Sequence, residues 1–135
     1  MAGKITLEVA VPTQLLFRDQ VDEVVLPGSN GYFGVLPQHA PLISELGTGV
    51  LTYQIAQTRR YMAINGGVAE VLADRVRVLA DTAEWAEEID VKRAELALRR
   101  ATDLLQRHDM EIDVERAQRA VQRAQARLAA HEHRQ

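Results

Sequence analysis

The placement of glycine and proline divides this 135-residue chain into two parts that need different kinds of structure. All eight glycines and all four prolines lie before residue 68, and neither residue type follows Gly67. Glycine and proline interrupt regular elements and form turns, so the first part should consist of short elements with frequent turns. The second part lacks both residues and can sustain long helices.

The first part has the hydrophobic period of β-strands. Ile5, Leu7 and Val9 alternate with Thr6 and Glu8, as in a strand with one buried face. Further apolar runs are separated by polar or turn residues: Val24–Leu26, Val50–Ile55, Tyr61–Ile64, Val68–Leu72 and Val76–Ala80. Frequent short strands are typical of sandwiches and barrels, so we predict a β-sandwich domain over residues 1–84, with about 8–10 short strands.

The second part, residues 85–135, has the apolar spacing of two helices. Two stripes step by three and four residues: Val91, Ala94, Leu98, Ala101, Leu105, and then Val114, Ala117, Val121, Ala124, Leu128. Residues 107–110 between them show no strong pattern. We therefore predict an antiparallel helical hairpin, with helices at about 90–107 and 113–132, and an α+β fold class. Alanine and valine make up much of these apolar stripes, so the hairpin should bind only weakly to the surface that it covers. A weakly bound hairpin can act as a movable switch, but small residues are also explained by close helix packing without any motion.

The two predicted helices open with the same pattern. Ile89–Ala94 and Ile112–Ala117 both read Ile-Asp-Val-x-Arg-Ala. An aspartate at this position caps a helix by accepting hydrogen bonds from free backbone N–H groups. Capping is one explanation for Asp90 and Asp113, and a ligand-binding role is the other.

Four arginines share one face of the second predicted helix. Their spacing of three, four and four residues brings them into line: Arg116, Arg119, Arg123 and Arg127. Like charges in a row repel unless an anion or an acidic surface is near. The face is either solvated and relieved by the acidic first helix, or it recognises an anion such as a nucleotide or an acidic partner helix.

Composition excludes several classes of function. The chain has a net charge of -3 and no cysteine, which argues against nucleic-acid binding and thiolate chemistry. No apolar run is long enough to span a membrane, and Met1–Lys4 leads directly into a strand pattern without a signal peptide, so we expect a cytoplasmic protein. The chain has four histidines: His39, His108, His131 and His133. None is spaced from a nucleophile, a carboxylate or a second metal ligand in a recognisable catalytic or metal-binding pattern, so we expect no catalytic and no metal-binding residue.

The most specific segment is Leu26–Leu42, which is rich in glycine and proline. It is followed by Gly47-Thr48-Gly49, by Asn65–Val71 and by Val76–Asp81. In order and spacing these blocks resemble the ATP synthase epsilon subunit family, and the resemblance continues through the hairpin. It implies a non-catalytic rotor subunit of the central stalk of an F-type proton-translocating ATP synthase. Such a subunit couples rotation to ATP synthesis, needs no cofactor and sits peripherally at the cytoplasmic face of the cell membrane.

The resemblance also implies partners for the sandwich. In the family this domain docks on the gamma subunit and on the membrane rotor ring of c subunits, and the matching positions are Gly31, Tyr32, Phe33 and His39. The family often has an acidic residue where Tyr32 stands. From the residues alone, Tyr32 and Phe33 are equally well explained as core aromatics beside a turn, and His39 as a turn histidine that bonds to backbone.

For the hairpin, the resemblance implies two regulatory roles. When extended toward the alpha and beta subunits, the hairpin blocks ATP hydrolysis through its basic face, here Arg116, Arg119, Arg123 and Arg127. When folded, some members bind ATP as a regulatory ligand, and the matching positions are Glu84, Ile89, Asp90, Arg93, Ala94, Arg100, Arg123 and Arg127. No phosphate-binding glycine loop accompanies them, so we expect sensing without hydrolysis. A stand-alone nucleotide sensor or helical adaptor is the alternative, but it leaves the glycine-proline segment without a purpose.

Overall fold

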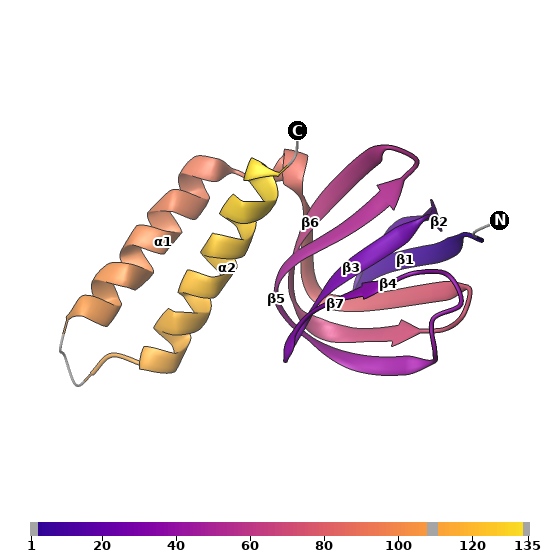
Figure 1. Cartoon of the computed structure of the whole chain (residues 1–135). Coiled ribbons are helices and arrows are strands. Elements are labelled where there is room, and N and C mark those ends of the chain that lie inside the picture. The colour runs from indigo at the N-terminus through magenta and orange to yellow at the C-terminus, as the bar shows by residue number, and fades with distance from the viewer. Residues whose placement is uncertain (1–2, 108–110, 134–135) are drawn as a thin grey trace.

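The computed structural model describes residues 3–107 and 111–133 as a strand-rich domain followed by two helices (Figure 1). His108 and the rest of the predicted connector at 108–110 lie outside the described residues. The strands are β1 (Ile5–Val11), β2 (Gln14–Val21), β3 (Glu23–Gly28), β4 (Gly31–Val35), β5 (Leu42–Ile55), β6 (Thr58–Val71) and β7 (Arg75–Trp85). A short 3₁₀ helix η1 (Ala86–Glu88) leads into α1 (Val91–Gln106) and α2 (Val114–Glu132).

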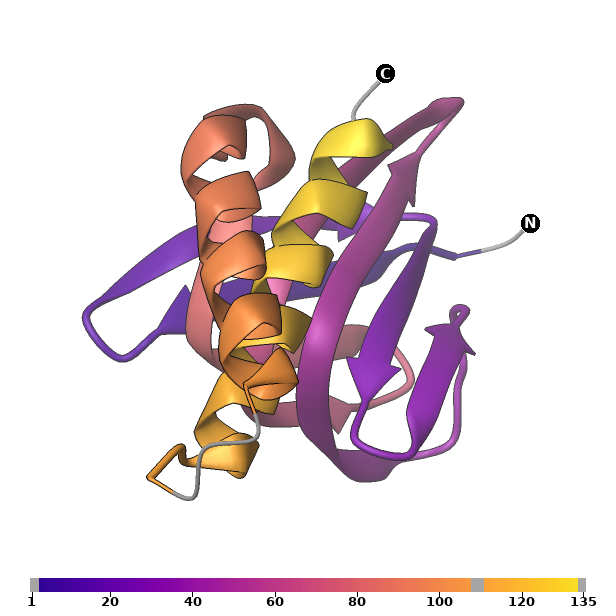
Figure 2. The ribbon, with the colours of Figure 1, turned by 90° about the vertical axis from the view of Figure 1, so that its left-hand side faces the viewer.

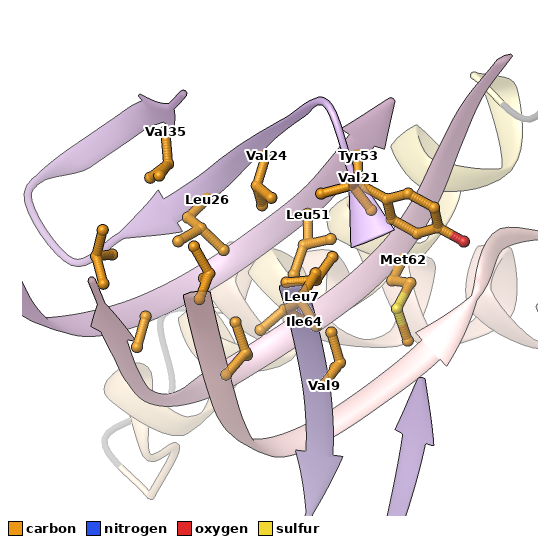
Figure 3. Close-up of a cluster of buried hydrophobic side chains, with 14 of the residues drawn as sticks. Leu7, Val9, Val21, Val24, Leu26, Val35, Leu51, Tyr53, Met62 and Ile64 are labelled. Carbon is orange, nitrogen blue, oxygen red and sulfur yellow. The ribbon is translucent and has the colours of Figure 1, made fainter. Parts of the chain in front are cut away.

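The strands form one sheet that folds over on itself. Its order is β2-β1-β7-β6-β5-β3-β4, and every pair except β1–β7 is antiparallel. Phe17 of β2 stacks on Tyr53 of β5 with ring centroids 4.6 Å apart, although three strands separate these two in the sheet. Side chains from the inward faces fill the space between the layers, among them Leu7, Leu51 and Ile64 (Figure 3). The predicted sandwich and the α+β class are confirmed.

The strands are fewer and longer than predicted. The described residues contain seven, and β5 and β6 each run for 14 residues. The two predicted strands Tyr61–Ile64 and Val68–Leu72 are parts of one continuous strand, β6, which ends one residue earlier, at Val71. They are not separate strands because Gly66 and Gly67 bend β6 instead of ending it. Both have positive φ, 67° and 117°. The neighbouring stretch of β5 also contains two glycines, Gly47 and Gly49, so the paired strands can curve together and carry the sheet into its second layer.

Both helices start at capping aspartates, as the repeated pattern predicted. The Asp90 side chain accepts a hydrogen bond from the Arg93 backbone N–H at 3.1 Å, and Asp113 accepts one from the Arg116 N–H at 3.1 Å. Each bond satisfies a donor that the first helical turn leaves free. The capping explanation therefore holds for both residues, and it leaves the remaining carboxylate oxygen of Asp90 available for other contacts.

Helix α2 lies between α1 and the sandwich (Figures 1 and 2). On its inner side, Ala130 is buried with Val50 of β5, Ala63 of β6, and Ala86 and Ile89 of the linker. On the α1 side the seam is built from alanines exposed by no more than 4%: Ala94, Ala101, Ala117 and Ala124. An alanine buries little apolar area, so α2 is held by close contacts of small apolar area both on the α1 side and, through Ala130, on the sheet side.

The bend in β6 yields a stability prediction. A Cβ at Gly67 would lie 2.1 Å from the Leu79 carbonyl oxygen, and φ there is 117°. Gly67→Ala should therefore lower the free energy of unfolding by at least about 2 kcal/mol in urea titrations. Gly34→Ala is the matched control, since a Cβ there meets no heavy atom within 4 Å. Equal stabilities of the two variants would contradict the proposed role of the bend.

Candidate functional site

One charged contact joins the hairpin to the sandwich. The Arg127 Nε of α2 donates to Glu84 Oε1 near the end of β7, at 2.6 Å. The distance is that of a strong charge-assisted hydrogen bond. Both side chains are about a third exposed, so solvent screens the pair and its net contribution to stability is modest. The contact thus fixes the position of α2 more than it adds to the stability of the fold.

Beside this pair is a charged cavity of about 360 Å³ at the junction of β7, η1, α1 and α2. It is lined by Glu84, Glu88, Asp90, Arg93, Ala94 and Arg127. Five of these are residues that the resemblance assigned to ATP. They come from positions more than forty residues apart, and the docking of α2 brings them together. Carboxylates can accept from ribose hydroxyls or an adenine amino group, and guanidinium groups can hold phosphate oxygens.

The other predicted ATP residues lie elsewhere. Ile89 is buried at 7% exposure and packs with Ala86 and Ala130, which makes it an anchor for the linker. Arg123 lines a second, smaller cavity beside the first, together with Glu84, Arg127 and the hydrogen-bonded pair Thr48–Asn65. Its volume of about 10 Å³ has room for about one water molecule. Arg100 is exposed on α1 and is not among the lining residues of either cavity.

The sequence reasoning missed Glu88. The doublet Glu87-Glu88 gave no sign of which side chain faces the cavity, because that depends on the turn of η1. In the structure Glu87 lies 3.5 Å from Arg60, while Glu88 lines the cavity. The three carboxylates of the cavity therefore outnumber its two arginines. An entering polyphosphate must displace Glu84 from Arg127 or bring a cation with it.

The arginine face divides into two zones along α2. Arg116 and Arg119 are exposed near the start of the helix, and Arg119 lies 3.9 Å from Glu115. Arg123 and Arg127 are half-buried against the sandwich. The docked hairpin thus presents only the first two guanidinium groups freely to a partner.

The glycine-proline segment contains the proposed rotor contacts. Gly31, with φ 131°, begins β4 after a two-residue turn. Phe33 packs against the sandwich core, whereas Tyr32 stays 59% exposed and its phenol oxygen accepts from the Val50 N–H at 2.9 Å. His39 is half-buried, with its Nδ1 2.7 Å from the Ala40 carbonyl oxygen. Of the two neighbouring aromatics, only Phe33 is a core residue.

A second surface escaped the sequence reasoning. Ile43, Val68 and Leu79 of β5, β6 and β7 are exposed on the outward face of the sheet, where register pairs Val68 with Leu79. Glu70 and Arg77 pair beside them. The signal was in the sequence, since apolar residues at outward positions break the strand alternation. A grouped, exposed apolar face of this kind is typical of a protein-docking surface.

Residues 3–107 and 111–133 contain no group of three or more acidic or histidine side chains arranged to hold a metal ion. Neither of their helices combines the length and hydrophobicity that crossing a bilayer requires.

The chain matches known proteins over both of its parts. Residues 4–86 match the family model described as ATP synthase, Delta/Epsilon chain, beta-sandwich domain, and residues 87–132 match that of its long alpha-helix domain. The ATP synthase epsilon chain of Solibacter usitatus is 54% identical over 101 residues, 75% of each chain. That of Carboxydothermus hydrogenoformans is 48% identical over 107 residues, 79% of this chain and 80% of the relative.

Solved structures agree on the fold. A chain in the mitochondrial ATP synthase of Euglena gracilis, solved with its c-ring, superposes with a TM-score of 0.83 at 24% identity, covering 94% of this chain and 81% of that one. A chain from the central stalk and c-ring of the Tetrahymena thermophila enzyme gives 0.62 at 10% identity, covering 96% and 98%. With both domains matched and relatives near half identity, the chain belongs to the epsilon-chain family of F-type ATP synthases.

Proposed function

We propose that this protein is a non-catalytic central-stalk subunit that links the gamma subunit to the c-ring, inhibits ATP hydrolysis and senses ATP through its hairpin. It acts peripherally at the cytoplasmic face of the cell membrane. Family membership supports the stalk assignment, and the solved complexes that share its fold are described as rotary ATP synthases with a c-ring. The observation that carries the regulatory part is the charged cavity that forms only where α2 meets the sandwich.

For the stalk, the gamma subunit is the proposed partner of the exposed apolar face. A rotating connection needs a rigid platform, and the sandwich supplies one through its closed core. Ile43, Val68 and Leu79 offer apolar area without disturbing that core, because they project outward. The turn that bears Gly31, Tyr32 and Phe33, with His39, is the proposed contact with the c-ring.

For regulation, the hairpin has two proposed positions. In the docked position Arg127 is bound to Glu84, and Arg93 and Arg127 line the cavity that would receive ATP. Bound ATP would bridge β7, α1 and α2 and so favour docking, because a ligand stabilises the state that it binds. In the extended position the arginine face would be free to meet an acidic segment of the beta subunit. Because the alanine contact buries little apolar area, the free-energy difference between the two positions is small enough for ligand binding to reverse it.

ATP titration of the isolated chain, by calorimetry or NMR, tests the sensor role. The parent chain should bind ATP, and Arg93→Ala should weaken binding about tenfold or more, because one charge-assisted contact is lost. Arg93 is exposed, so this variant leaves the docking of α2 intact. Arg119→Ala removes an equal charge away from the cavity and should bind like the parent. No binding by the parent at millimolar ATP would refute the sensor role.

ATP hydrolysis by the assembled complex tests the inhibitory role. The double variant Arg116→Ala, Arg119→Ala should raise hydrolysis severalfold, since two cations that face an acidic partner are removed. Lys92→Ala with Arg99→Ala removes the same charge from exposed positions of α1 and serves as the control. Equal hydrolysis rates for both double variants would argue against the arginine face as the inhibitory element.

Co-purification with the gamma subunit tests the docking face. Leu79→Glu places a charge within the apolar face, beside Val68, and should abolish stable binding. Leu96→Glu is the matched control, because Leu96 on α1 is 52% exposed and lies outside the sheet, whereas Leu79 is 54% exposed. If Leu79→Glu retains gamma while Leu96→Glu loses it, gamma binds the hairpin and not the exposed apolar face of the sheet.

A further inference from the structure

Tyr32 occupies an unusual place for an exposed aromatic residue. It follows the two-residue turn between β3 and β4 and lies opposite Pro27 in the register. Its ring remains 59% exposed, yet its phenol oxygen accepts a hydrogen bond from the backbone N–H of Val50, 18 residues away on β5. The side chain therefore reaches from the edge strand β4 across β3 to β5.

The Val50 N–H is available because β3 and β5 pair irregularly. Val25 pairs with Thr52, but the next pair joins Gly28 to Leu46, so β5 advances six residues while β3 advances three. The extra residues of β5 bulge away from β3, and the phenol oxygen of Tyr32 takes the place of the missing strand acceptor.

Gly49 leaves room for this phenol group. A Cβ at that position would lie 2.4 Å from the phenol oxygen and 2.8 Å from Pro27 Cβ. Any side chain at residue 49 would therefore expel the phenol group from its place. The local sequence Gly49-Val50 and the distant Tyr32 together form one contact.

Helix α2 rests on the same part of β5. Val50 is buried together with Ala130 of α2. Tyr32 borders a groove of about 430 Å³ that is also walled by Gln122, Gln125, Ala126 and Ala129. It borders a second groove of about 420 Å³ that Ala129 and His133 also line. Tyr32 thus flanks the C-terminal half of α2, while β3 and β4 lie beyond β5 (Figure 2).

We propose that Tyr32 is a positioning residue for the hairpin: its hydrogen bond to Val50 holds the bulge of β5 in the shape on which α2 docks. The contact lies within one chain and does not depend on the proposed function. If the turn at Gly31–Phe33 also meets the c-ring, one side chain is shared between the ring contact and the hairpin contact, and the two contacts are coupled.

Hydrogen exchange of the isolated chain, read residue by residue, tests this role. Tyr32→Phe keeps the ring and removes only the hydroxyl group. It should speed exchange of the α2 amides about five- to tenfold, the effect of one hydrogen bond, while core amides of β1 and β7 keep their rates. Gly49→Ala crowds both the phenol group and Pro27 Cβ, so it should also speed exchange of the α2 amides, with an added effect on β3.

Two controls make the outcome decisive. Tyr61→Phe alters the other tyrosine near the end of α2 but keeps its ring, 5.6 Å from His133, and should leave exchange unchanged. Gly34→Ala controls for adding a methyl group to a glycine of the same sheet. Unchanged α2 rates in Tyr32→Phe would overturn the proposal. Equal acceleration in α2 and in the core would also overturn it, because Tyr32 would then stabilise only the sandwich.

Discussion

The curvature of β5 and β6 is the constraint on which the rest of this structure depends. Each strand contains two glycines where the pair curves, and those of β6, Gly66 and Gly67, adopt backbone angles that residues with a Cβ rarely reach. The curve folds a single sheet into two layers and so closes the core. It also presents Val50 and Ala63 to α2, and places Thr48 and Asn65 beside Arg123 and Arg127.

The contact between hairpin and sandwich combines close geometry with little apolar area. Alanines let the backbone of α2 approach the sheet, but each buries less apolar area than a leucine would. Every missing CH₂ group lowers the hydrophobic stabilisation of the contact by roughly 0.8 kcal/mol. The pair Glu84–Arg127 and the bond Tyr32–Val50 set where the helix rests. A contact of this kind is well defined in position and modest in energy, which is what a ligand-controlled element requires.

Much of the fold could be predicted because it follows from local rules. The switch of apolar spacing from alternation to steps of three and four located the change from strands to helices, and Asp90 and Asp113 were predicted and confirmed as caps. The number of strands was wrong because a glycine pair looks the same in sequence whether it turns a chain back or bends a strand. Glu88 was missed, and Arg100 lies apart from the cavity, since facing directions depend on packing.

The strand-rich and helical parts, the helix starts and the line of four arginines on α2 can be inferred from the sequence, because periodicity and backbone preference act over a few residues. Which charges meet depends on how the elements pack. Glu84 and Arg127 are 43 residues apart, and Tyr32 and Val50 are 18 apart. Their contacts exist because the sheet curves and α2 docks on it, and no local preference encodes that long-range geometry.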